Sequence, residues 1–430
     1  MREHRPDSSP APAGWRVRIL FVVISVCLFG LAAEGGARLW SLVRGWRHET
    51  GTARTERRSP PTDAEITAAG RALGLDPYEI ADFSHPGHWR LRPGYRATVS
   101  EMLAEKRSLG RQLTVRYIEE QAPRLGIGAD EVAVAINADG FRGPPIDREH
   151  RQYRILTLGD SCTFGSPLSQ WHGYPRALER ELRRRGFGVE VINAGVEGYS
   201  PINVLARLDE FRALRPDLTT IYIGWNALYL EPFLENATGL RRHLASARLV
   251  ARAWGLLRAR FVDPREAAIE SYERPKRPER SAREVHLLGG FTPSFLPEVV
   301  QIIEEMQAVG SQVVILTLPG LYSMDREPSP RALEIGHLPV YTDNPFVLAR
   351  MAERYNNALR ALARDRRLVV VDLDRWASET LTPADEHFID SVHLDDLSQE
   401  RLGIYLAEQI EPLLPSVTSA SGGAEGTQAP

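Results

Sequence analysis

Two short blocks in the chain contain the residue types needed for nucleophilic attack on a carbonyl carbon. Ser161 lies in the run Gly-Asp-Ser-Cys-Thr-Phe-Gly, whose glycines allow a sharp turn that presents the serine outward. A serine hydroxyl is a poor nucleophile at neutral pH and needs a base at hydrogen-bond distance. Asp390 and His393 are three residues apart, so the carboxylate can bond Nδ1 and leave Nε2 facing a nucleophile. Each block alone is weak evidence, since Ser161 or Asp160 could simply cap a helix.

Two further blocks contain groups that could stabilise a negatively charged oxygen. Asn193 begins a segment with glycines at Gly195 and Gly198, and either glycine could direct a backbone N–H into a site. Asn226 follows a predicted strand in the run Gly-Trp-Asn-Ala and could donate its side-chain amide to an oxyanion. The competing interpretation of both blocks is ordinary turn chemistry.

Metal, thiol and disulfide chemistry have less support. His387 could join Asp390 and His393 around a metal ion, but no fourth ligand suggests itself. Cys162 could be proposed as an alternative nucleophile. It is next to Ser161, however, and adjacent side chains point in different directions, so the two cannot serve the same site equally. The only other cysteine, Cys27, lies in a distant apolar run, so a disulfide framework is excluded.

The four blocks lie within a pattern of alternating apolar strands and helices from residue 150 to residue 414. This pattern predicts a three-layer α/β/α domain of flavodoxin-like type with a five-stranded parallel sheet. The expected strands are 153–158, 189–192, 218–223, 313–317 and 368–372. The expected helices are 174–185, 204–214, 297–308, 346–363 and 397–413. The blocks follow the first, second, third and fifth strands, where sites in such sheets lie.

The order Ser, Gly, Asn, Asp-x-x-His at successive strand ends resembles the SGNH hydrolases, also called the GDSL esterase/lipase family. The resemblance covers about residues 152–414. It implies that Ser161 is the nucleophile, that His393 is the general base and acid, and that Asp390 orients the imidazole. It also implies that no metal and no organic cofactor is required.

The resemblance also implies the composition of an oxyanion hole. Its donors would be the backbone N–H groups of Ser161 and Gly198 and the side-chain amide of Asn226, with Gly195 as the runner-up glycine. One departure is clear, because the family's Gly-x-Asn-Asp block ends in Ala227 here. That aspartate is not a triad member, so its loss is compatible with catalysis but puts the geometry of the loop in doubt.

The implied function is a serine esterase that hydrolyses an O-acyl or O-acetyl ester of a small molecule, a lipid or a glycan. Two alternatives stay open. The same triad could transfer an acetyl group to or from an envelope polysaccharide, or the fold could serve a non-catalytic binding protein, as Ala227 would allow.

Charge argues against a nucleic-acid partner, since 53 Lys+Arg against 56 Asp+Glu leave a net charge of −3. Only Lys106 and Lys276 are lysines, so 53 − 2 = 51 basic residues are arginines. We attribute this surplus to the codon usage of a GC-rich genome.

The amino-terminal part predicts a membrane-anchored protein, and with the resemblance it implies a bacterial member of the family. A polar segment, 1–18, precedes an apolar stretch, 19–38, which we expect to be a single transmembrane signal anchor. A cleaved signal peptide and a buried helix are the alternatives. Arginines flank the stretch on both sides and leave its orientation open. We favour an exported catalytic domain because an uncleaved anchor is a common route to export.

The remaining regions have no assigned chemistry. We expect residues 39–151 to be a linker with an accessory or stalk segment, and residues 415–430 to be a disordered tail. A helical insertion at about residues 228–290 follows the third block and contains several arginines. It could form a lid over the site or a solvated pair of surface helices.

Overall fold

The computed structural model describes residues 79–80, 90–108, 112–231 and 274–415 of the 430 residues. The predicted segments 1–18 and 19–38, most of the insertion and the tail beyond residue 415 lie outside this part of the chain. Within the described residues, no helix combines the length and the apolar character that crossing a bilayer requires.

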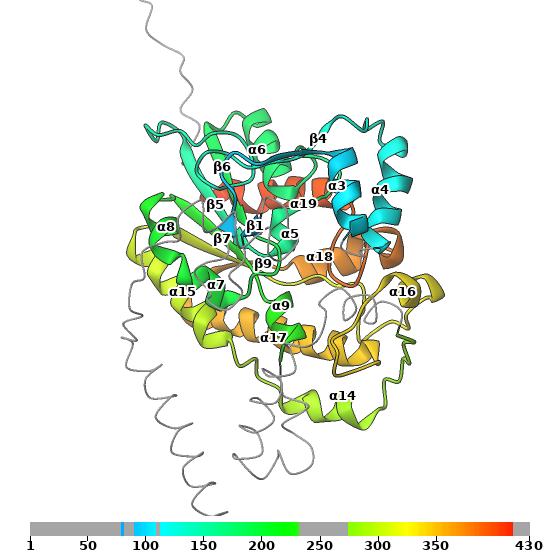
Figure 1. Cartoon of the computed structure of the whole chain (residues 1–430). Helices are drawn as coiled ribbons and strands as arrows, with labels where there is room; N and C mark the ends of the chain where they lie inside the picture. Colours follow the sequence, from blue (N-terminus) through cyan, green and yellow to red (C-terminus); the bar gives the residue numbers. More distant parts are fainter. Residues whose placement is uncertain (1–78, 81–89, 109–111, 232–273, 416–430) are drawn as a thin grey trace, which may run out of the picture. The chain divides into compact units, whose positions relative to one another are not determined.

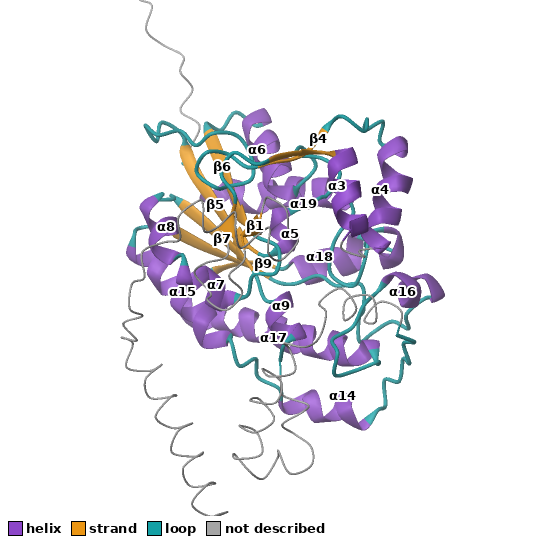
Figure 2. Ribbon diagram, viewed as in Figure 1, coloured by secondary structure: helices purple, strands orange, loops and turns teal. Residues whose placement is uncertain are grey.

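A five-stranded sheet, parallel throughout, forms the centre of the fold (Figure 2). Its spatial order is β6-β5-β7-β8-β9. The side chains of β5, β6 and β7 are almost all buried, which explains why these strands are continuous runs of apolar and β-branched residues. The strands are β5 (Tyr153–Gly159), β6 (Val189–Gly195), β7 (Leu218–Tyr222), β8 (Gln312–Leu316) and β9 (Val369–Val371).

Helices flank the sheet, as the sequence predicts for an α/β domain (Figures 1 and 2). Helix α6 packs on α19 and β6, whereas α15 packs on β8 and on α7 and α8. The helices that follow β5 are α5 (Ser161–Phe164), α6 (Tyr174–Arg184), α7 (Pro201–Ala206), α8 (Leu208–Ala213), α9 (Trp225–Tyr229), α14 (Arg283–Leu287), α15 (Leu296–Ala308), α16 (Pro330–Ile335), α17 (Pro345–Arg366), α18 (Leu373–Thr380) and α19 (Asp396–Ile410). Short 3-10 turns are η2 (Leu288–Gly290), η3 (Ala384–Glu386) and η4 (Glu411–Leu413).

The predicted strands and most of the predicted helices agree with the structure within a few residues. The helix predicted at residues 204–214 is wrong, because the chain forms α7 and α8 with a break at Arg207. This buried arginine leaves the helical conformation and donates to the Tyr199 hydroxyl at 3.1 Å and to Glu210 at 2.8 Å. A helix that the sequence analysis did not predict, α18, follows β9 directly.

The region before β5 forms a small layer against the sheet domain. It contains β1 (Glu79–Ile80), β2 (Arg90–Leu91), β3 (Arg96–Thr98), α3 (Val99–Ser108), α4 (Gln112–Arg124) and β4 (Val132–Ala135), and β3 pairs antiparallel with β4. Figure 1 shows α3 and α4 side by side, and the Tyr117 hydroxyl of α4 donates to Asp396 of α19 at 2.6 Å. We refer to residues 90–151 as the N-terminal layer.

Candidate active site

The candidate nucleophile, Ser161, is the first residue of the single-turn helix α5 at the carboxyl end of β5. Asp160 caps this turn, since its side chain accepts from the Cys162 N–H at 2.9 Å. The backbone N–H groups of Thr163 and Phe164 donate to the Asp160 carbonyl at 3.0 and 2.9 Å. This arrangement leaves the Ser161 amide at the open end of the turn, without a hydrogen bond to the described part of the chain.

The candidate base and its carboxylate lie in a closed loop between η3 and α19. Phe388 and Leu394 pair across the loop in an antiparallel bridge, and the Ile389 N–H donates to the His393 carbonyl at 2.9 Å. One carboxylate oxygen of Asp390 accepts the backbone N–H groups of Val392 and His393, both at 2.9 Å. The other carboxylate oxygen is left for the imidazole. A spacing of three residues therefore lets Asp390 bond both the loop backbone and the His393 ring.

The structure brings the three predicted triad residues into one line of hydrogen bonds. The distance from Ser161 Oγ to His393 Nε2 is 2.7 Å, and the distance from His393 Nδ1 to Asp390 Oδ2 is also 2.7 Å. Both distances lie in the range for proton transfer between a nucleophile, a base and the group that orients the base. The arrangement matches the geometry that activates a serine toward acyl carbonyls.

Charge in the site favours a protonated imidazole. Burial disfavours the imidazolium, but the Asp390 carboxylate beside Nδ1, with smaller contributions from Asp160 and Glu197, holds the pKa of His393 above its ordinary value. Burial alone would raise the pKa of Asp390, but attraction to His393 and the N–H groups around its carboxylate hold it well below its usual range. Asp390 therefore stays ionised and can stabilise the imidazolium that forms during attack.

The pH dependence of activity follows from the raised pKa of His393. Only the neutral imidazole can accept the Ser161 proton, so kcat/KM is expected to rise with pH as His393 loses its proton. The midpoint should lie above 6.5, the ordinary value for histidine. A pH profile of kcat/KM on an activated ester measures this midpoint, and a midpoint at or below 6.5 would contradict the assignment.

The candidate oxyanion donors come from the second and third blocks. Gly198 has a φ of +80°, which favours glycine, and its N–H makes no hydrogen bond to the described residues. The Gly195 N–H is engaged by the Asn193 side chain at 2.9 Å. A Cβ on Gly195 would lie 2.1 Å from the Phe164 nitrogen, so this glycine permits close packing of β6 on α5. Gly198 is thus the better donor of the two glycines.

The asparagine of the third block lies against the second block. Asn226 Nδ2 donates to the Tyr199 carbonyl at 2.9 Å, next to Gly198, and has a second hydrogen for an oxyanion. Gly224 precedes it with a φ of +146°, and a Cβ there would lie 2.5 Å from the ring of Tyr355. Ala227, where the sequence departs from the family pattern, lies within the single turn of α9. The contact between Asn226 and the second block forms with alanine at this position.

Substitution of Asn226 by alanine is expected to lower kcat by about 10²- to 10³-fold, the usual effect of losing one oxyanion donor. The substitution Asn203→Ala is the matched control, because the Asn203 side chain accepts the Ser200 N–H in the capping box of α7 in the same region. The control should lower thermal stability and leave kcat unchanged. Steady-state kinetics on both variants measures the difference, and equal losses of kcat would remove Asn226 from the oxyanion hole.

Two residues weighed in the sequence analysis lie outside the line of hydrogen bonds. His387 Nδ1 is 3.1 Å from the Ser398 hydroxyl, at the start of α19. Cys162 is buried, its sulfur donates to the Val392 carbonyl at 3.5 Å, and burial raises the pKa of its thiol. In the described part of the chain, no cluster of His, Cys, Asp or Glu side chains could hold a metal ion.

The sequence analysis missed two residues beside the nucleophile. Burial raises the pKa of Asp160 to about 6, although the Cys162 N–H and the charge of His393 oppose this shift. The sequence analysis considered Asp160 only as a helix cap. Arg142 comes from the N-terminal layer and donates to the Phe164 carbonyl at 2.8 Å. No pattern in the sequence distinguishes it from the 50 other arginines.

Residues 157–401, more than half of the chain, match the profile of the GDSL-like Lipase/Acylhydrolase family. The chain belongs to this family, in agreement with the resemblance seen in the four blocks. It is therefore an ester hydrolase of the GDSL esterase/acylhydrolase class. No curated protein matches the chain.

Several solved structures are similar to this chain at low identity. A lipase/acylhydrolase from Enterococcus faecalis is 18% identical, with a TM-score of 0.36 over 61% of this chain and 97% of that one. An acetylxylan esterase from Geobacillus stearothermophilus is 15% identical, with a TM-score of 0.37 over 60% and 94%. A G-D-S-L lipolytic protein from Veillonella parvula is 15% identical, with a TM-score of 0.34 over 61% and 99%. The family assignment rests on the profile match and not on these similarities.

Proposed function

We propose that this protein is a serine ester hydrolase in which Ser161 is the nucleophile, His393 the general base and acid, and Asp390 the residue that orients the imidazole. The observation that carries the proposal is the continuous line of hydrogen bonds from Asp390 through His393 to Ser161. Ser161 lies 232 positions before His393 in the sequence, so its alignment with Asp390 and His393 is a property of the fold.

The proposed reaction proceeds through an acyl-enzyme. Ser161 Oγ attacks the acyl carbonyl while His393 Nε2 accepts its proton, and the resulting oxyanion accepts hydrogen bonds from the oxyanion donors. The imidazolium then protonates the departing alcohol, and the carbon–oxygen bond of the ester breaks. Water, deprotonated by the same imidazole, then attacks the acyl carbon of the acyl-enzyme. The bond between that carbon and Ser161 Oγ breaks, the imidazolium returns the proton to Oγ, and the carboxylic acid leaves. The proposed donors are the N–H groups of Ser161 and Gly198 and the side-chain amide of Asn226.

The substrate that we propose is an O-acyl or O-acetyl ester carried by a glycan, a lipid or a small molecule. The support is the chemistry of the site, because the proposed triad and oxyanion donors act on the acyl carbonyl, which all of these esters share. The acyl-enzyme is also the intermediate of acyl transfer. A direct comparison of acetate released to water with acetyl transferred to an added sugar separates the two reactions.

Covalent labelling by a serine-directed fluorophosphonate tests the proposal. The wild-type protein should be labelled, Ser161→Ala should not, and Cys162→Ala should still be labelled because its thiol is buried outside the proposed line. Circular dichroism confirms that each variant is folded. A folded wild-type protein that resists labelling would overturn the proposal, as would a folded Ser161→Ala variant that is labelled at the wild-type rate.

We also propose that residues 19–38 anchor the protein in a bacterial membrane and that the catalytic domain is exported. The support is the apolar stretch, uncharged from Ile19 to Ala33, that follows a polar, arginine-containing segment. Cell fractionation with and without residues 1–38, combined with protease accessibility of the domain, tests both points. A full-length chain recovered in the soluble cytoplasm would refute them.

A further inference from the structure

Arg142 of the N-terminal layer reaches the helix that bears the candidate nucleophile. The chain reverses direction after β4 at residues 137–141, and Arg142 then forms isolated antiparallel bridges with Ile136 on one side and with Asn193 of β6 on the other. Arg142 thus connects the rest of the N-terminal layer to the edge strand of the catalytic sheet.

The guanidinium group of Arg142 is buried, with 4% of the residue exposed, and it bonds mainly to backbone carbonyls. Nη1 donates to the Phe164 carbonyl at 2.8 Å, and Nε donates to the Gln170 side chain at 3.3 Å. The group also lies over the Phe164 ring, 4.6 Å from its centroid. Nη2 donates to the carbonyls of Ala133 at 2.8 Å, Ser166 at 2.8 Å and Ser169 at 3.1 Å.

The Phe164 carbonyl is the last of α5, a helix of four residues that begins at Ser161. It accepts a second hydrogen bond from Asn193 Nδ2 at 3.1 Å. The Phe164 N–H donates to the Asp160 carbonyl at 2.9 Å, so this hydrogen bond couples the two ends of the turn. A displacement at its carboxyl end would therefore change the position of Ser161 relative to His393.

We propose that Arg142 is a positioning residue for the nucleophile: it holds the carboxyl end of α5 and so sets the distance from Ser161 Oγ to His393 Nε2. Arg142 does not touch the reacting atoms. The inference rests on the proposed function. It implies that the N-terminal layer contributes to catalysis by holding the nucleophile in position. The planar guanidinium group suits this role because it serves several fixed carbonyls at once, which a lysine ammonium cannot do.

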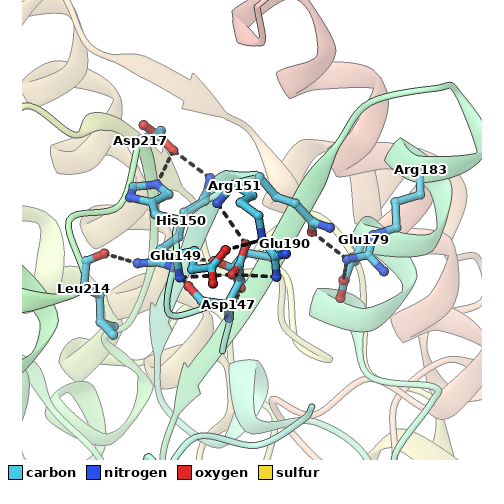
Figure 3. Close-up of polar contacts among 11 residues, drawn as sticks. Asp147, Glu149, His150, Arg151, Glu179, Arg183, Glu190, Leu214 and Asp217 are labelled. Atoms are coloured by element: carbon cyan, nitrogen blue, oxygen red, sulfur yellow. Dashed lines mark hydrogen bonds and ion pairs between the residues drawn. The ribbon is translucent and has the colours of Figure 1, made fainter. Parts of the chain in front are cut away.

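Arg154 provides a matched control. It is also a buried arginine, with 5% exposed, and it donates to Glu190 Oε1 at 2.6 Å and to the Leu214 and Asp147 carbonyls. Figure 3 shows the surrounding network, which includes Asp147, Glu190 and Leu214. Arg154 lies near the start of β5, seven residues and therefore roughly 20 Å from Ser161 along an extended strand. Its replacement perturbs the same domain without touching α5.

The experiment compares Arg142→Lys and Arg154→Lys in the full-length protein. Fluorophosphonate titration counts the functional sites, and kcat and KM per site are then measured on p-nitrophenyl acetate, together with the melting temperature. We expect Arg142→Lys to lower kcat per site by about 10- to 100-fold, the usual effect of a small misplacement of a reacting group. KM and the pH midpoint should stay close to wild type, and Arg154→Lys should lower only the melting temperature.

A wild-type kcat per site in Arg142→Lys would overturn the proposal, and so would an equal loss of kcat in Arg154→Lys. If Arg142→Lys does not fold, Asn193→Asp replaces it, because this variant removes the second donor to the Phe164 carbonyl and keeps the acceptor for the Gly195 N–H. It should lower kcat per site in the same manner, and a folded Asn193→Asp with wild-type kcat would count against the proposal. Failure of the wild-type protein to react with fluorophosphonate is a separate result, which refutes the proposed function.

Discussion

Replacement of His393 by alanine is expected to lower kcat by about 10⁴- to 10⁶-fold, the range observed when the base of a serine triad is removed. The reason is the contact between His393 Nε2 and Ser161 Oγ at 2.7 Å, the only hydrogen bond by which the serine side chain contacts a base in the described residues. Without it, the hydroxyl must attack with its proton in place. Steady-state kinetics on an activated ester measures the loss.

His387 is the internal control for this experiment. It lies six residues before His393 in the same loop, but its ring contacts Ser398. We expect His387→Ala to change kcat little. The double variant Ser161→Ala/His393→Ala should be no less active than either single variant, because residues that act as one unit are strongly non-additive. A large loss in His387→Ala and a small loss in His393→Ala would reverse the assignment.

Replacement of Asp390 by asparagine is expected to lower kcat by about 10⁴-fold with little change in the loop. Oδ1 of Asp390 already accepts two backbone N–H groups, so an asparagine would keep its carbonyl oxygen there and turn its NH₂ group toward His393 Nδ1. That arrangement favours the tautomer with its proton on Nε2, which cannot accept a proton from Ser161. The loss therefore reflects the wrong tautomer as well as a missing charge.

The same variant should also move the pH midpoint of kcat/KM downward, because Asp390 is the main charge that raises the pKa of His393. Asp395→Asn is the matched control, since Asp395 caps α19 two residues after His393 by accepting the Ser398 N–H at 2.7 Å. Aspartate and asparagine cap helices about equally well, so both kcat and the midpoint should be unchanged. A midpoint in Asp390→Asn at or above the wild-type value would contradict the electrostatic role.

The sequence predicts the central sheet well because its strands are continuous apolar runs, and burial on both faces leaves few alternatives. The order of the four blocks along these strands also predicts which residues meet. The prediction of one helix over residues 204–214 is wrong because of a tertiary contact, since Arg207 leaves the helical conformation and donates to the Tyr199 hydroxyl. The spacing of apolar residues does not predict such a contact, because the sequence does not distinguish a buried arginine from an exposed one.

The contribution of the N-terminal layer was also beyond sequence reasoning. Arg142 acts on carbonyl groups, which every residue has, so nothing in the sequence near Phe164 marks its partner. The choice between Gly195 and Gly198 likewise needed the structure, because it depends on which N–H the Asn193 side chain already occupies. In both cases the deciding contact is made by the backbone.

The bridge between Arg142 and Asn193 has a consequence for the solubility of shortened forms of the protein. β6 is an outer strand of the sheet, and this bridge covers part of its outer side near the carboxyl end. A fragment that starts at residue 152 would uncover that side, and exposed strand edges pair readily with other chains. Such a fragment would be prone to aggregate even though it retains every residue of the proposed triad.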